Sequence, residues 1–168
     1  MAKRPVAPLA DERVRLRLLQ PDDLPLTLAW RNQDHIRQWF FYSDPLTPAQ
    51  HAAWYAQYAE RDDDFVFIIE EAAQAHRPVG QVALYHIDWA ARRAEFGRLL
   101  IGEADAAGRG LARAATALLV QAAQGQWGLH EIYLEVYTHN AAARAIYARC
   151  GFQMAGTQDN IVRMSVTL

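Results

Sequence analysis

Apolar and polar residues alternate in several short stretches, a pattern typical of strands with one buried face. In VRLRLL, residues 14–19, Val14, Leu16 and Leu18 alternate with arginines and predict the first strand. Three further apolar or alternating runs, separated by short polar stretches, predict an antiparallel meander; they cover 64–71, 78–88 and 92–101. Later strands are predicted at 130–140, 152–157 and 161–168.

Between these runs the hydrophobic period changes to that of amphipathic helices. Residues 21–41 read as helical, with Pro21 and Asp22 suited to a first turn, and a second helix is expected after an N-cap at Thr47. A third helix has one apolar face, formed by Leu111, Ala115, Leu118, Leu119 and Ala122. A fourth has a shorter stripe and ends at a glycine; its residues are Ala143, Ile146, Tyr147, Cys150 and Gly151.

The order of elements predicts an α+β (mixed α/β) fold, with about four helices around one mostly antiparallel sheet of six to seven strands. At 168 residues the chain fits one domain, 1–168, in which residues 1–12 are expected to be a flexible N-terminus.

Composition narrows the functional classes. The net charge of -2 gives no general attraction to nucleic acid or to anionic membranes, and no run of about 18 apolar residues indicates a membrane span. Cys150 is the single cysteine, so we expect neither an intramolecular disulfide nor a cysteine zinc cluster, and a cytoplasmic location follows. The separated histidines His76, His130 and His139 lack ligand spacing, so no metal is predicted.

A glycine-containing turn precedes the third helix. Gly108 and Gly110 stand where the chain enters that helix, whose free N–H groups and positive dipole end favour a phosphate group. Arg109 and Arg113 are placed to flank the phosphate. The alternative is an ordinary helix cap. The turn is neither a P-loop nor a dinucleotide fingerprint, since the required lysine and glycine spacings are missing.

Four segments together resemble the GCN5-related N-acetyltransferases (GNAT), which use acetyl-CoA. They are AEFGRLLI, the turn GRGLA at 108–112, YLEV, and the run NAAARAIYARCGF at 140–152. The resemblance covers about 14–168. One departure is Ala107, which stands where the family's phosphate loop commonly has Gln or Arg.

The resemblance implies an acetyl-CoA-binding core at 92–152, in which strands four and five splay apart. The pantetheine arm is then expected to pair with the exposed strand edge, held by N–H groups near Leu99, Leu100 and Ile101 that also polarise the thioester carbonyl. The pyrophosphate is expected on the turn at 106–112 and the start of the helix, in contact with Gly108, Arg109, Gly110, Leu111, Ala112 and Arg113.

By the same resemblance Tyr147 is the proton donor to the departing thiolate, and Asn140 contacts the pantetheine or its water. Without the motif, a tyrosine on an apolar stripe is usually just packing. Glu135 is the first choice for general base, with burial expected to bring its pKa toward the working range. The alternative is an exposed strand glutamate beside an arginine, and Glu95 and His86 are reserves.

The acceptor is expected to bind to the helices at 20–62, with Arg31, Trp39, Tyr42, His51 and Trp54 as contacts. Their pattern, W-R-N, I-R-x-W and H-x-x-W, resembles acetyltransferases that act on nucleotide-linked amino sugars of the pseudaminic acid pathway. Arginine or histidine would bind the diphosphate, and aromatic rings the flat base and sugar faces. The alternative is that these residues pack the helix pair.

Other acceptors remain open, and so does another class of protein. Ribosomal-protein-like enzymes acting on protein N-termini, and small-amine or polyamine acetyltransferases, share much of the pattern, and the acidic run at 60–64 would suit an ammonium group. A non-catalytic acyl-CoA-binding module would have the same fold. As an enzyme the protein is expected to be a monomer or homodimer.

Overall fold

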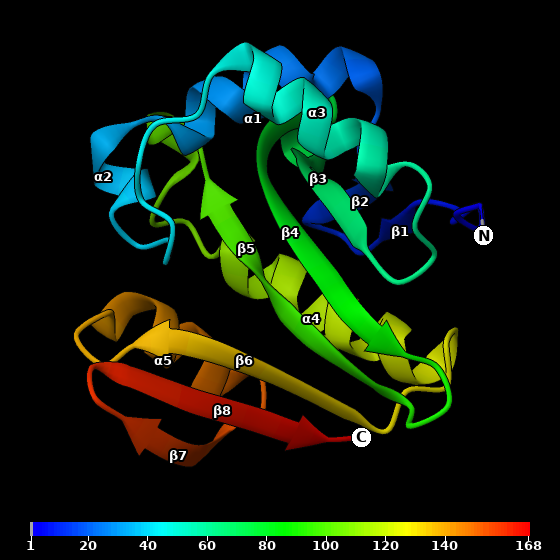
Figure 1. The fold of residues 1–168 in the computed structure, drawn as a ribbon, viewed down its shortest axis with the longest axis vertical. Helices are drawn as coiled ribbons and strands as arrows, with labels where there is room; N and C mark the ends of the chain where they lie inside the picture. Colours follow the sequence, from blue (N-terminus) through cyan, green and yellow to red (C-terminus); the bar gives the residue numbers. More distant parts are fainter. Residues whose placement is uncertain (1) are drawn as a thin grey trace.

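The computed structural model describes residues 2–168 and contains an eight-stranded sheet of order β1-β2-β3-β4-β5-β6-β8-β7 (Figure 1). Neighbouring strands are antiparallel except β5 and β6, which run parallel. The strands are β1 Leu9–Ala10, β2 Val14–Leu18, β3 Phe65–Glu71, β4 Arg77–Asp88, β5 Arg93–Ile101, β6 Glu131–Tyr137, β7 Gln153–Gln158 and β8 Ile161–Thr167. The helices are α1 Leu24–Arg31, α2 Asp34–Arg37, α3 Pro48–Tyr58, α4 Leu111–Gly125 and α5 Ala141–Arg149, with 3-10 turns at Pro21–Asp23, Ala72–Gln74 and Ala104–Ala106.

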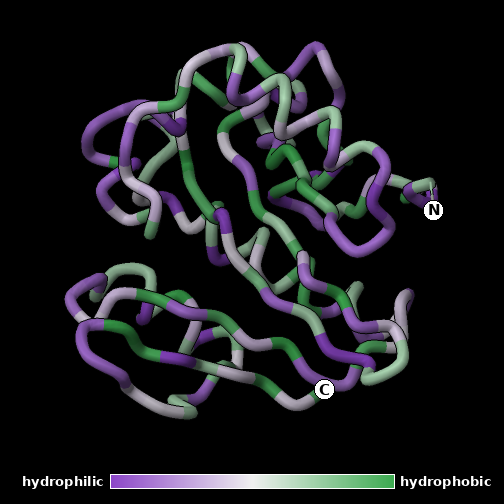
Figure 2. Tube along the Cα trace, in the orientation of Figure 1, coloured by the Kyte–Doolittle hydropathy of each residue, from purple (hydrophilic) through white to green (hydrophobic). Residues whose placement is uncertain are grey.

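The helices divide between the two faces of the sheet. The larger core cluster joins α4 and α5 to one face, and the smaller cluster joins α1 and α3 to the other face of β3, β4 and β5. Strand β3 is buried along its whole length because its side chains alternate between the two clusters: Phe67 lies in the larger one and Ile68 in the smaller. Figure 2 shows hydrophobic positions along these central strands and hydrophilic ones at many of the connecting turns.

The predicted fold class is confirmed, and two details differ from the expectation. The sheet has eight strands rather than six or seven, because Leu9–Ala10 pairs with β2. The N-terminal segment expected to be flexible is held in place: Arg4 forms an ion pair with Asp62, and Leu9 is buried in the larger core.

The long helix expected over 21–41 is interrupted. A 3-10 turn leads into α1, the chain bends at Asn32 and Gln33, and α2 is a single short helix followed by an irregular loop. By contrast α3 begins where the sequence predicts, since Thr47 is the N-cap, its hydroxyl accepts a hydrogen bond from the Gln50 amide at 3.1 Å, and Pro48 is the first helical residue.

Candidate active site

Strands β5 and β6 pair only at their beginnings and then diverge. Their pairing covers residues 93–95 and 131–133, after which the remainder of β5 loses its neighbour on that side (Figure 1). A cavity of about 560 Å³ occupies the opening, lined by β5, β6, α5 and the loop after α2. The edge of β5 therefore offers unpaired backbone groups to a ligand, as an added strand would require.

A β-bulge shapes this edge. The register between β4 and β5 shifts between Gln81 and Ala83, and Arg98 has a left-handed φ of 54°. The preceding residue, Gly97, allows the bulge to form against β4, because a Cβ there would lie 2.5 Å from the hydroxyl oxygen of Tyr85. Leu99, Leu100 and Ile101 follow the bulge and all line the cavity. The predicted cofactor residues of β5 thus lie at the open edge.

The start of α4 forms the other end of the cleft. The N-cap Gly110 has φ 80° and supplies no side chain to the first N–H groups of the helix, so these remain open to an anion. A second cavity of about 380 Å³ lies against Gly108, Gly110 and Arg113, and shares Ile101 and Ala112 with the first. The two cavities form one cleft that extends from the helix terminus to the splayed strands.

The arginines near this turn differ from the expected set. Arg109 does not line either cavity; its guanidinium pairs with buried Glu71 at 2.6 Å and donates to the Asp105 carbonyl at 3.1 Å. Arg149, at the end of α5, does line the second cavity together with Arg113. The sequence offered a signal for Arg149, because it lies within the run 140–152 two residues after Tyr147.

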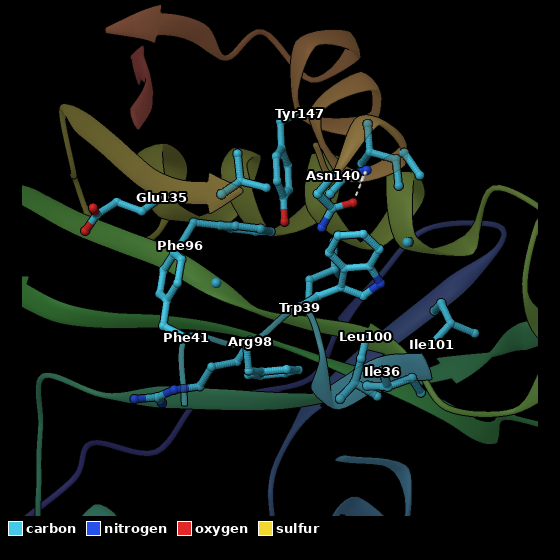
Figure 3. A pocket seen from close by; sticks show the side chains of 18 of the residues that line it. Ile36, Trp39, Phe41, Phe96, Arg98, Leu100, Ile101, Glu135, Asn140 and Tyr147 are labelled. Atoms are coloured by element: carbon cyan, nitrogen blue, oxygen red, sulfur yellow. Dashed lines mark hydrogen bonds between the residues drawn. The ribbon is translucent and has the colours of Figure 1, made fainter. Parts of the chain in front are cut away.

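Tyr147 lies at the centre of the cleft. Its ring is 7% exposed and packs edge-on against Phe96, with centroids 5.7 Å apart, while its hydroxyl points into the cavity (Figure 3). Burial raises the pKa of Tyr147, so the phenol stays protonated at neutral pH. This is the protonation state that a proton donor needs.

Asn140 has a local role as well as a place in the cavity. Its side-chain oxygen accepts a hydrogen bond from the Ala143 amide at 3.2 Å and caps α5. Its side chain lines the same cavity as Tyr147 (Figure 3). The cap fixes the start of the helix and thereby the direction of Tyr147.

The expected burial of Glu135 is wrong. Glu135 lines the cavity but is exposed, because the helices that cover this face of β3 to β5 do not extend over β6. Its register partner on β8 is Arg163. The reserve residues lie together on the neighbouring strands: Glu95 accepts hydrogen bonds from His86 at 2.9 Å and from the Tyr85 hydroxyl at 3.3 Å.

The W-R-N segment holds the loop between α2 and α3. Trp30 is buried and donates from its indole to Glu103 at 2.5 Å. Arg31 is buried and donates to the carbonyls of Tyr42 and Asp44. Asn32 exchanges two hydrogen bonds with the Leu46 backbone, at 2.8 and 2.9 Å.

Three more of the expected acceptor contacts, His51, Trp54 and Tyr42, also lie outside the cavity lining. His51 bonds Thr27 at 2.9 Å, and burial lowers its pKa, which favours a neutral ring. Trp54 stacks on His51 and Tyr58 inside the smaller cluster, and Tyr42 is 56% exposed. A diphosphate contact by Arg31 or His51 therefore has no support from their positions.

Of the expected acceptor contacts, Trp39 does line the cavity, in an aromatic wall that sequence reasoning largely missed. Phe40 and Phe41 from the same loop, and Phe96 from β5, line it as well. Phe41 packs edge-on against Tyr137 of β6, with centroids 5.0 Å apart, so the loop reaches across the opening. The consecutive aromatics at 39–42 were the available signal.

Residues 2–168 contain neither a membrane-spanning helix nor a cluster of metal ligands. No helix there combines the length and the apolar character needed to cross a bilayer. Within the same residues, no three or more His, Cys, Asp or Glu side chains gather as a metal would need.

A parallel strand pair that opens beside a helix terminus without a side-chain cap, with a buried phenol aimed into the gap, is the arrangement expected of a CoA-dependent acyltransferase. The chain belongs to the acetyltransferase (GNAT) domain family, which it matches over residues 13–153. The predicted family and enzyme class, an N-acetyltransferase, are thereby confirmed.

Solved structures share the fold. Spermidine N-acetyltransferase from Vibrio cholerae, in complex with CoA and spermine, is 24% identical with a TM-score of 0.83, covering 94% of this chain and 96% of that one. A domain from Methanocaldococcus jannaschii DSM 2661 is 23% identical (TM-score 0.81; 94% and 100% covered). A dodecameric structure of the Vibrio enzyme is 24% identical (TM-score 0.76; 94% and 95% covered). No curated protein matches the chain.

Proposed function

We propose that this protein transfers the acetyl group of acetyl-CoA to the primary amino group of a small molecule. The observation that carries the proposal is the single cleft that joins the open N-terminus of α4 to the hydroxyl of Tyr147. The first end suits a pyrophosphate, the unpaired β5 edge suits a pantetheine arm, and the second end suits a thioester.

In the proposed reaction the neutral amine nitrogen attacks the thioester carbonyl carbon, and the oxyanion is stabilised by N–H groups after the Arg98 bulge. The carbon–sulfur bond then breaks, and the thiolate takes the proton of Tyr147. The amine proton leaves through water to Glu135, whose exposed carboxylate lines the cavity and can exchange protons with solvent.

The proposal is tested by incubating the purified protein with acetyl-CoA and a panel of primary amines, and measuring free CoA thiol. Tyr147→Phe should lower kcat by about 10² to 10⁴, the range for loss of a general acid. The melting temperature should change little because the packed ring remains. Tyr133→Phe, on β6 and outside the cavity lining, is the matched control and should keep full turnover.

Unchanged turnover in Tyr147→Phe would remove the assignment of the acid. A pH–rate profile of Glu135→Gln that keeps its acidic limb would move the base to Glu95 or to water. Failure to release CoA with every amine tested would favour a silent acyl-CoA-binding module.

A polyamine acceptor is the second candidate, and the observation in its favour is the likeness to spermidine N-acetyltransferase. The nucleotide-linked amino sugar is not supported by the comparisons or by the positions of Arg31 and His51. Spermidine, a short peptide with a free N-terminus and a UDP-linked amino sugar therefore belong in the panel.

A further inference from the structure

We infer that the acceptor is a singly charged amine with an aromatic or apolar body, rather than a polyamine. This inference rests on the proposed acetyl transfer and concerns only which amine the site takes. It comes from the aromatic wall, defined as Trp39, Phe40, Phe41, Tyr85 and Phe96, all of which line the cavity around Tyr147 (Figure 3).

Two rings of the aromatic wall are exposed to solvent. Trp39 is 37% exposed and Phe41 is 52% exposed, and among residues 2–168 only Tyr42 and Met154 are other large apolar side chains exposed to this extent. Both rings face the cavity rather than open solvent alone, since both line it. A flat apolar body placed between them would remove this surface from water and offer edge-to-face contacts.

The wall is also fixed before a ligand arrives. Arg31 and Asn32 hold the loop through backbone groups of Tyr42, Asp44 and Leu46, and Arg37 donates to the Ser43 carbonyl at 2.8 Å. The rings of Phe41 and Trp39 rest on Tyr137 and His139, with centroids 5.0 and 5.2 Å apart. Binding therefore costs little conformational entropy in the loop, and a rigid flat acceptor keeps the cost low on its own side as well.

The charges argue against a polycation. Among the residues that line this cavity, Glu135 is the single carboxylate, and Arg98 is a cation. The carboxylate nearest to Arg98, that of buried Asp64, is already paired with it at 2.7 Å. A polyamine keeps at least one more ammonium group after the reacting nitrogen loses its proton. Because Glu135 is assigned to the reacting nitrogen, that second ammonium group would find no further carboxylate in the cavity lining to pair with.

The test compares kcat/KM for 2-phenylethylamine, spermidine and a short peptide with a free N-terminus at saturating acetyl-CoA. We expect the value for phenylethylamine to exceed that for spermidine by at least about tenfold, the range set by apolar pocket contacts. Trp39→Ala and Phe41→Ala should each lower kcat/KM for phenylethylamine by roughly five- to fiftyfold, while the KM for acetyl-CoA stays constant. Tyr42→Ala should change kcat/KM for phenylethylamine less than about twofold. It removes an exposed aromatic ring of the same loop that lies outside the cavity lining.

Arg98→Gln gives a second reading that does not depend on the loop. It removes the cation from the cavity lining, so it should raise the ratio of spermidine to phenylethylamine turnover; because it also leaves buried Asp64 without its partner, the melting temperature should fall. Wild-type preference for spermidine or for the peptide would overturn the inference and leave the proposed acetyl transfer intact. Unchanged phenylethylamine kinetics in both loop variants, with normal melting temperatures, would overturn it as well. If no amine releases CoA, the proposed function itself fails.

Discussion

The two halves of the cleft use the chain in different ways. On the proposed cofactor side, the open β5 edge and the α4 terminus present mainly backbone groups. On the acceptor side, aromatic side chains form the wall, and the backbone is bound by Arg31 and Asn32. Binding in the cofactor half should therefore be weakened by larger side chains, and binding in the acceptor half by the removal of side chains.

The largest effect is expected from Gly110→Val. A β-branched residue is strained at φ 80°, and its Cβ would lie 2.9 Å from an Arg13 guanidinium nitrogen, so the turn should shift away from the phosphate position. The KM for acetyl-CoA should rise more than about tenfold, as loss of one anion contact already costs about that much. Steady-state kinetics measure it. Gly125→Ala, at the other end of α4 with open space around it, is the control and should slightly raise the melting temperature.

Arg149→Gln should have the next largest effect, a rise in the KM for acetyl-CoA of about three- to tenfold with a weaker dependence on salt. Arg109→Gln is the matched comparison: it strands buried Glu71, so it should lower the melting temperature and change the KM less than Arg149→Gln. The reverse order would show that Arg109, rather than Arg149, meets the phosphates.

Asn32→Ala tests the acceptor half by removal. It takes away both hydrogen bonds to Leu46 and loosens the loop that carries the aromatic wall. We expect the acceptor KM to rise about threefold, the equivalent of one hydrogen bond, with the KM for acetyl-CoA unchanged. Equal changes in both constants would contradict a division of the cleft into two halves.

The smallest effect is expected in the pH dependence of kcat. Because burial raises the pKa of Tyr147, the phenol remains protonated above the range where an ordinary tyrosine ionises. The kcat should rise as the amine loses its proton and should not fall between about pH 9.5 and pH 11, where an ordinary tyrosine ionises. A falling limb there that disappears in Tyr147→Phe would mean that the phenol ionises earlier than its burial implies.

Local signals account for what the sequence predicted well. The Thr47 cap, the glycine turn before α4 and the helix that carries Tyr147 are all specified within a few residues, and the structure has each of them. The expected burial of Glu135 was wrong because its exposure depends on which strands the N-terminal helices cover. That is a property of the whole sheet.

The acceptor motif failed for a similar reason. Arginine and asparagine next to Trp30 suit a ligand as well as they suit a carbonyl, and the spacing of W-R-N does not decide between the two. The decision comes from Tyr42 and Leu46, more than ten residues away, whose backbone groups fold back onto Arg31 and Asn32. Residues that gain their role through such distant contacts leave no local pattern.

The way this loop is bound has a consequence for how the protein can change. The hydrogen bonds that hold it end on the backbone of residues 42–46, so they do not depend on which side chains stand at 39–43. Substitutions within that stretch alter the wall without dismantling its support. Substitutions in this segment, whether natural or engineered, can therefore change which acceptor is acylated without altering the residues of the catalytic half.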